Sequence, residues 1–205
     1  MSLITKLEYQ KNNPDRANLY LDDKFYCGIS VELCIKEHLK SGIEIDEERL
    51  NELILEDEKG VAFSKAINYV SNNYKTKKQV KDYLYKKGYN KNTIVYVIDK
   101  MEEYKYLDDE SYAKQFVLTY SKKYGKLKLI SGLRSKGISD TIIDNLFDGD
   151  VEIKSDIESV ASKYLKNKIL DEKTYLKLSR FLYSRGFEFD EINSYLNKLK
   201  KENIC

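Results

Sequence analysis

The chain has 205 residues, of which 34% are charged, nine are glycine and one is proline. This composition favours helix over sheet, and the length allows one large domain or a small domain followed by a repeat array. The formal net charge of +2 hides an asymmetry, because residues 1–58 hold 7 Lys and Arg against 14 Asp and Glu, whereas residues 59–205 hold 29 against 20. Balances of −7 and +9 predict an acidic module joined to a basic one.

The cysteines exclude two kinds of site. Cys27, Cys34 and Cys205 have neither the spacing of zinc ligands nor that of a redox pair. Their odd number favours a reducing compartment.

No N-terminal apolar run follows a basic start, and no apolar stretch approaches the roughly 18 residues that a membrane-spanning helix needs. We therefore expect a soluble, cytoplasmic protein without a membrane partner.

The opening segment has the alternation of β-strands. Apolar and polar residues alternate over 4–10 and again over 17–21, and a third short run covers 25–29. Turn-forming residues separate the runs, at 12–15 and at 22–24. The pattern predicts a three-stranded antiparallel β-meander.

Two helices are predicted to complete this module. Ser30 is expected to cap a short helix that continues to about Lys40 and is stopped by Gly42. A second helix is expected to begin at Asp46. The charged run 56–60 has the character of a boundary, which places a small acidic α+β module at 1–58, although an uninterrupted helix into Ala62 fits the same residues.

The remainder of the chain is periodic. Gly88, Gly137 and Gly186 each follow a basic residue and are spaced 49 residues apart. Three apolar columns keep the same register around them, eight and four residues before each glycine and six after it: Val80, Leu129 and Leu178; Leu84, Leu133 and Leu182; Ile94, Ile143 and Ile192. A fixed period of this size is typical of stacked supersecondary units.

Each period reads as three helices, with the glycine as the left-handed stop between the second and the third. Thr76 and Gln79 form a capping box, and Asp108 and Asp171 are expected to be N-caps. We therefore predict a mainly α protein: an array of three three-helix repeats at 59–108, 109–150 and 151–205, preceded by the small α+β module with its β-meander.

Catalytic motifs are absent from the sequence. It contains no nucleophile elbow, phosphate-binding glycine loop, zinc-protease pair or dinucleotide fingerprint. His38 is the only histidine, and a lone histidine lacks the partnered groups that catalysis or metal binding requires. The run Asp108-Asp109-Glu110 is explained by helix capping, because neighbouring helix residues do not face one site. We expect no enzyme, metal or cofactor.

Basic residues gather in the second helix of each repeat. Lys77, Lys81 and Tyr85 are expected on one outward stripe at four-residue spacing. The corresponding positions are Lys126, Ile130 and Arg134 in the second repeat and Tyr175, Ser179 and Tyr183 in the third. A stripe of Lys, Arg and Tyr suits an anionic partner, either a nucleic acid or an acidic protein groove.

Structural explanations compete with binding. Lysines on a helix face are often simply solvated, and the column Lys87, Lys136 and Arg185 lies in a last helical turn, where a cation interacts well with the helix dipole. The 18 tyrosines are also more often half-buried packing residues than platforms for base stacking.

Five sequence segments resemble the RecX family, bacterial regulatory proteins that modulate the recombinase RecA: 76–80 (TKKQV), 84–88 (LYKKG), 106–113 (YLDDESYA), 133–137 (LRSKG) and 184–187 (SRGF). The resemblance covers residues 59–201. It implies three tandem three-helix units that lie in the groove of a RecA filament on single-stranded DNA, that dampen recombinase and coprotease activity in DNA repair and the SOS response, and that bind DNA weakly.

The resemblance brings no catalytic residue with it. We expect a monomeric, non-enzymatic regulator, and the alternative is an autonomous DNA-binding helical-repeat protein. The candidate binding residues in either case are the basic and aromatic side chains of the second helices: Lys77, Lys78, Lys81, Tyr85, Lys86, Lys87, Lys126, Lys128, Arg134, Lys136, Arg180 and Arg185.

Overall fold

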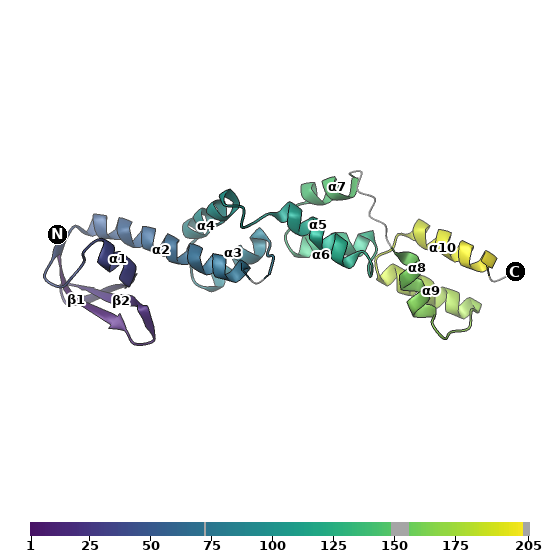
Figure 1. Ribbon diagram of the computed structural model, residues 1–205, viewed down its shortest axis with the longest axis horizontal. Helices are drawn as coiled ribbons and strands as arrows, with labels where there is room; N and C mark the ends of the chain where they lie inside the picture. The colour runs from purple at the N-terminus through teal and green to yellow at the C-terminus, as the bar shows by residue number, and fades with distance from the viewer. Residues whose placement is uncertain (72, 149–155, 203–205) are drawn as a thin grey trace. The chain divides into compact units, whose positions relative to one another are not determined.

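The computed structural model describes residues 1–71, 73–148 and 156–202, which form a small sheet and a succession of helices (Figure 1). The order is β1 (Ser2–Gln10), β2 (Asn13–Leu21), β3 (Lys24–Ser30), α1 (Val31–Lys36), β4 (Glu44–Ile45), α2 (Glu47–Val70), α3 (Lys77–Lys86), α4 (Lys91–Glu103), α5 (Asp109–Tyr120), α6 (Lys126–Ser135), α7 (Asp140–Asp148), α8 (Ile157–Leu165), α9 (Glu172–Ser184) and α10 (Phe189–Glu202). The predicted fold class is confirmed.

The chain forms two compact units. The first comprises residues 1–72 and 84–103, and the second comprises residues 73–83 and 104–205. The division passes through α3, so that the start of this helix belongs with the second and third repeats. The first unit holds the sheet module, α2 and α4.

The sheet confirms the predicted meander and extends it by one strand. Its order is β3-β2-β1-β4, with every pairing antiparallel. The predicted turn at 12–15 is too long, because β2 already begins at Asn13 and includes Pro14. Next to Pro14, the pairing of β1 with β2 shifts register between Tyr9 and Gln10. The second turn is confirmed, since Asp22 and Asp23 both have positive φ, as a tight hairpin turn requires.

Helix α1 is shorter than predicted. Ser30 caps it as expected, by accepting a hydrogen bond from the Leu33 N–H at 3.0 Å. The helix nevertheless ends at Lys36, because the chain turns at His38, which has a φ of 51°, and Leu39 then bonds back to the Cys34 carbonyl. Gly42 lies in the following loop, so it does not terminate the helix.

Helix α2 runs without a break through 56–60, which decides between the two expectations for this run in favour of the continuous helix. The acidic residues of the run hold other elements in place. Asp57 accepts hydrogen bonds from the N–H and hydroxyl of Ser30, and Glu58 accepts from Asn90 and Thr93 at the start of α4. The charges that suggested a module boundary therefore make tertiary contacts on both sides of one helix.

Separate apolar clusters form the cores. The sheet packs on α1 and the first half of α2 through residues such as Leu19, Ile29 and Leu50. The second and third repeats are built around the predicted columns, with Leu129, Leu133 and Ile143 in one cluster and Leu178, Leu182 and Ile192 in the other. In the first unit Ile94 of α4 is likewise buried.

All three ladder glycines adopt the predicted left-handed conformation. Their φ angles are 87° at Gly88, 84° at Gly137 and 86° at Gly186. Each closes its helix in the same way: the residue after the glycine donates its N–H to the carbonyl five residues earlier, at Leu84, Leu133 and Leu182. This is the Schellman closure of a helix C-terminus.

Candidate partner-binding surface

The second helices α3, α6 and α9 carry the predicted stripe. At their C-terminal ends Tyr85, Arg134 and Tyr183 are exposed, as expected for an outward face. At their N-terminal ends Lys77, Lys126 and Tyr175 are only half-buried, because neighbouring parts of the protein cover the starts of these helices. The middle column is exposed at Lys81 and half-buried at Ile130 and Ser179. The stripe is therefore outward along only part of its length.

The other predicted binding residues also divide by exposure. Lys78, Lys86, Lys87, Lys128 and Arg180 are exposed, whereas Lys136 and Arg185 are half-buried. Arg134 is exposed but forms an ion pair with Asp140 at 2.7 Å, and the ammonium of Lys126 lies 5.7 Å from the centre of the Phe147 ring. Side chains available to a partner are thus distributed over the second helices, and no closed site gathers them.

Several of these residues have a structural task where the start of α3 meets the second repeat. The buried Thr76 hydroxyl donates to the Lys136 carbonyl at 2.7 Å, and the Lys77 N–H donates to the Asp109 carboxylate at 3.0 Å. The Lys78 side chain fills the space where a Cβ on Gly137 would stand, 2.5 Å from the Lys78 Cβ. We call this contact the first joint.

The second joint repeats the first, 49 residues further along the chain. Gly125, which corresponds to Thr76, donates its N–H to the Arg185 carbonyl at 3.0 Å, and the Leu127 N–H donates to the Gly186 carbonyl at 3.0 Å. The Arg185 guanidinium lies over the rings of Tyr124 and Phe181, at 5.7 and 5.0 Å from their centres. The start of one second helix thus docks on the glycine turn of the next repeat.

The acidic run 108–110 is partly as predicted. Asp108 caps α5 by accepting from the Ser111 N–H and hydroxyl, and these hydrogen bonds lower the pKa of its carboxyl group. Asp109 does more than favour the helix dipole, because it is buried and accepts from Lys77 across the first joint. A buried carboxylate needs such a partner.

Sequence reasoning missed the joint residues, although a signal was present. Thr76 and Gly125 occupy the same position of the 49-residue ladder, and so do Lys136 and Arg185, whose carbonyls they contact. The pairing of the two columns could not be seen, because helix periodicity describes which face is buried but gives no information on which repeat covers it.

The described ranges lack two features, a metal-binding cluster and a membrane span. Over the described ranges, no group of three or more His, Cys, Asp and Glu side chains is arranged to hold a metal ion. Within the same ranges, none of the helices has the length and apolar character needed to cross a membrane. What the second helices present is positive charge and aromatic surface.

Comparison with known protein families identifies all four parts of the chain. Residues 2–46 match the regulatory protein RecX N-terminal domain. The first, second and third three-helix domains of RecX match residues 62–101, 108–146 and 156–196.

Similar full-length proteins carry the name regulatory protein RecX. That of Clostridium tetani is 39% identical over 203 residues, which cover 96% of this chain and 94% of the relative. That of Clostridium perfringens strain 13 is 35% identical and covers 97% of both chains, and that of Bacillus subtilis strain 168 is 33% identical, covering 99% of this chain and 79% of the relative.

Two solved structures share the fold. A crystal structure of regulatory protein RecX superposes with a TM-score of 0.65 at 22% identity, covering 97% of this chain and all of that one. RecX from Lactobacillus salivarius gives a TM-score of 0.62 at 24% identity, over 70% of this chain and 97% of that one.

Proposed function

The chain belongs to the RecX family, and from this premise we propose that it binds the RecA filament on single-stranded DNA in the cytoplasm and lowers its recombinase and coprotease activities. It acts without catalysis, as a monomer, through the second helices of the repeats. The observation that carries the proposal is the match of all four family domains, in order, along this one chain.

The charge of the repeats supports this function. Each second helix exposes cations, among them Lys81 on α3, Arg134 on α6 and Arg180 on α9. Residues 59–205 carry 29 Lys and Arg against 20 Asp and Glu. A nucleoprotein filament carries the phosphate charge of its DNA, so a cationic array is attracted to it, and the attraction weakens as salt is added.

The direct test is RecA-dependent ATP hydrolysis and strand exchange with the purified chain added at stoichiometric amounts. We expect both activities to fall, and cleavage stimulated by the RecA coprotease to fall with them. Unchanged activities would refute the proposal.

Autonomous DNA binding is the second candidate, favoured by the exposed Lys and Tyr side chains of α3. Titration of single-stranded DNA without RecA separates the two functions. Tight binding with a steep salt dependence would favour the autonomous function, because released counterions dominate such binding. Weak binding combined with modulation of RecA favours the regulator.

Charge reversal tests the surface itself. The combined variant Lys81→Glu, Arg134→Glu and Arg180→Glu should weaken filament binding by about tenfold or more, since three surface charge contacts of about 0.5–1 kcal/mol each are lost. The matched control reverses three exposed lysines outside the second helices, Lys114, Lys122 and Lys163, with the same change in net charge. Equal weakening by both variants would mean that net charge alone matters, and the second helices would lose their assigned role.

A further inference from the structure

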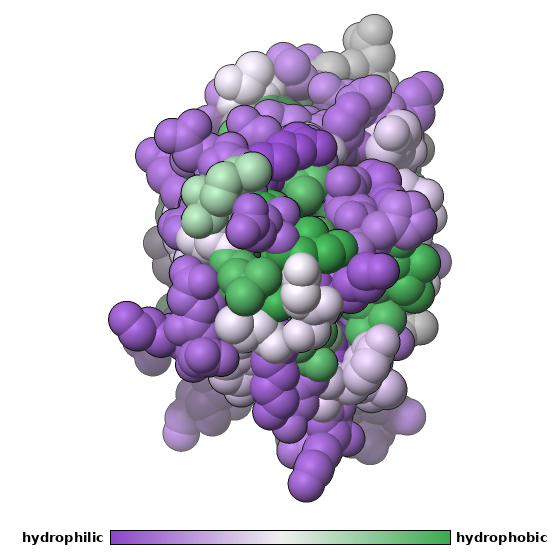
Figure 2. Space-filling view, turned by 90° about the vertical axis from the view of Figure 1, so that its left-hand side faces the viewer, coloured by the Kyte–Doolittle hydropathy of each residue, from purple (hydrophilic) through white to green (hydrophobic). Residues whose placement is uncertain are grey.

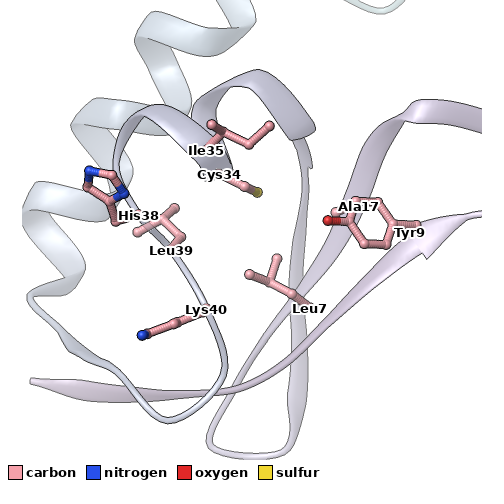
Figure 3. A pocket seen from close by; sticks show the side chains of 8 residues that line it. All are labelled: Leu7, Tyr9, Ala17, Cys34, Ile35, His38, Leu39 and Lys40. Atoms are coloured by element: carbon pink, nitrogen blue, oxygen red, sulfur yellow. The ribbon is translucent and has the colours of Figure 1, made fainter.

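The N-terminal module has a pocket that the proposed function does not use. Helix α1 lies mainly against β2 and β3, and β1 is the next strand of the sheet. A pocket of about 320 Å³ opens there between β1, α1 and the loop that follows α1 (Figure 3). Its buried wall is apolar and consists of Ala17, Cys34 and Leu39, with the half-buried Leu7 beside them.

Exposed apolar side chains also line the pocket. Tyr9 and Ile35 each have a fractional exposure of 68%, which is high for side chains of this size. Figure 2 looks onto the side of the molecule where β1 and β2 lie in Figure 1, and it shows apolar surface gathered among hydrophilic residues. Exposed apolar surface of this kind next to a pocket marks an interaction site.

The edge of the sheet beside the pocket is open. Strand β4 pairs only with Ser2 and Leu3, and the loop before it bonds to Ile4 and Thr5. Beyond Thr5, no residue in the described part of the chain pairs with this edge of β1, so those backbone groups of residues 6–10 that alternate away from β2 are available there. An open strand edge is a template for another strand.

We propose that the open edge of β1 and the adjoining pocket form one docking site for an extended segment of a partner protein. The segment pairs as an added strand beside residues 6–10 and places a bulky aliphatic or aromatic side chain in the pocket, between Tyr9 and Ile35. Strand addition supplies affinity through backbone hydrogen bonds, and the pocket supplies specificity through the side chain.

Charge selects the kind of partner. Residues 1–58 carry twice as many acidic as basic residues, 14 against 7, which disfavours a nucleic acid. Within the pocket, burial is the main cause that raises the pKa of Cys34, so its thiol is neutral. Lys40 lines the pocket without a carboxylate partner among the described residues. A segment with a carboxylate next to its apolar side chain therefore fits best.

A second copy of the chain fits less well. It would bring its own β1 to the edge, but the Leu7 and Tyr9 side chains of that strand already line its own pocket.

The inference rests on the proposed function in one respect, because the RecA filament supplies the partner used in its test. Co-sedimentation with RecA filaments on single-stranded DNA is measured for the full chain and for Tyr9→Asp and Ile35→Asp. The matched control is Phe25→Asp, because Phe25 is exposed to 61% on β3 at the opposite edge of the sheet. We expect at least about fivefold weaker binding for the first two variants and less than twofold for the control.

A second measurement follows the strand itself. Amide hydrogen exchange should slow in the presence of the filament at those residues of 6–10 whose N–H groups face the open edge, because strand addition protects these amides. The N–H groups that alternate with them already face β2. Binding of the variants at wild-type strength, or unprotected amides in bound chain, would overturn the docking site and leave the proposed function standing. A wild-type chain that does not sediment with the filament would overturn both. A dimer that Tyr9→Asp dissociates would overturn the proposal in favour of a second copy.

Discussion

Three glycines have the same backbone conformation but different neighbours. Substitution at these positions therefore separates the free-energy cost of a left-handed conformation from the cost of a steric clash. Gly88, Gly137 and Gly186 have φ angles between 84° and 87°. A Cβ on Gly88 would meet nothing within 4 Å, whereas one on Gly186 would lie 2.9 Å from the Lys128 Cα and closer still to its N and Cβ. Gly125, with a φ of −79°, completes the set, since its Cβ would meet the Gly186 carbonyl carbon at 2.5 Å without any left-handed strain.

Substitution by alanine should therefore give a graded series. Gly88→Ala should destabilise the fold by about 1 kcal/mol, because alanine is strained in the left-handed conformation and meets no neighbouring atom there. Gly125→Ala has only the clash at the second joint, which costs about 1–3 kcal/mol because backbone atoms have to move. Gly186→Ala has both, so we expect about 2–4 kcal/mol, from the sum of the two.

Urea unfolding followed by far-UV circular dichroism measures the series, with the thermal midpoint as a second readout. A change of 1 kcal/mol shifts the midpoint of a chain of this size by about 2–4 °C. Because repeat arrays can unfold in stages, the slope of each transition is compared between variants. If Gly88→Ala destabilised the protein as much as Gly186→Ala, the joint would contribute nothing and the reasoning would be refuted.

Two further outcomes test the caps and joints. Thr76→Val keeps the shape of a fully buried side chain but removes the hydroxyl, which donates to the Lys136 carbonyl at the first joint and accepts from the Gln79 N–H at the start of α3. Unfolding should therefore become easier by about 1–2 kcal/mol. Thr119→Val, whose exposed hydroxyl bonds within its own helix, should change little, and equal losses would contradict the buried role of Thr76. Hydrogen bonds from Thr174 lower the pKa of the Asp171 carboxyl group, so its stabilising effect is present above the unfolded-state pKa and is lost as the pH falls through the folded-state value. Acid titration of unfolding from about pH 5 to pH 2 should therefore be shallower for Asp171→Asn than for the wild type, and parallel curves would speak against this cap.

The periodic part of the fold was accessible from the sequence because its signals are local. The four-residue spacing of Leu129 and Leu133 defines a buried helix face, and a left-handed glycine after a basic residue marks a helix end. These signals depend on residues within one or two turns of each other. The glycine closures of the repeats were therefore predicted correctly.

Features that depend on distant partners were predicted less well. Asp57 and Glu58 suggested a module boundary, because a charge run carries no sign that Ser30 and Thr93 will bind to it. The half-burial of Lys77 and Lys126 arises at the joints, where another repeat covers the helix start. Periodicity predicted a stripe along the second helices, and tertiary packing decides how much of that stripe faces solvent.

The unbroken course of α2 also determines how the first unit comes apart. Leu50 and Leu53 in its first half are buried with the sheet, and Ala62 and Ala66 in its second half are buried where the repeats begin. Local unfolding at the centre of α2 would break the hydrogen bonds to Ser30 and to the start of α4 together, because Asp57 and Glu58 are adjacent. Sheet and first repeat should therefore melt in one cooperative step, and a chain shortened at residue 58 would begin in the middle of a helix without a cap.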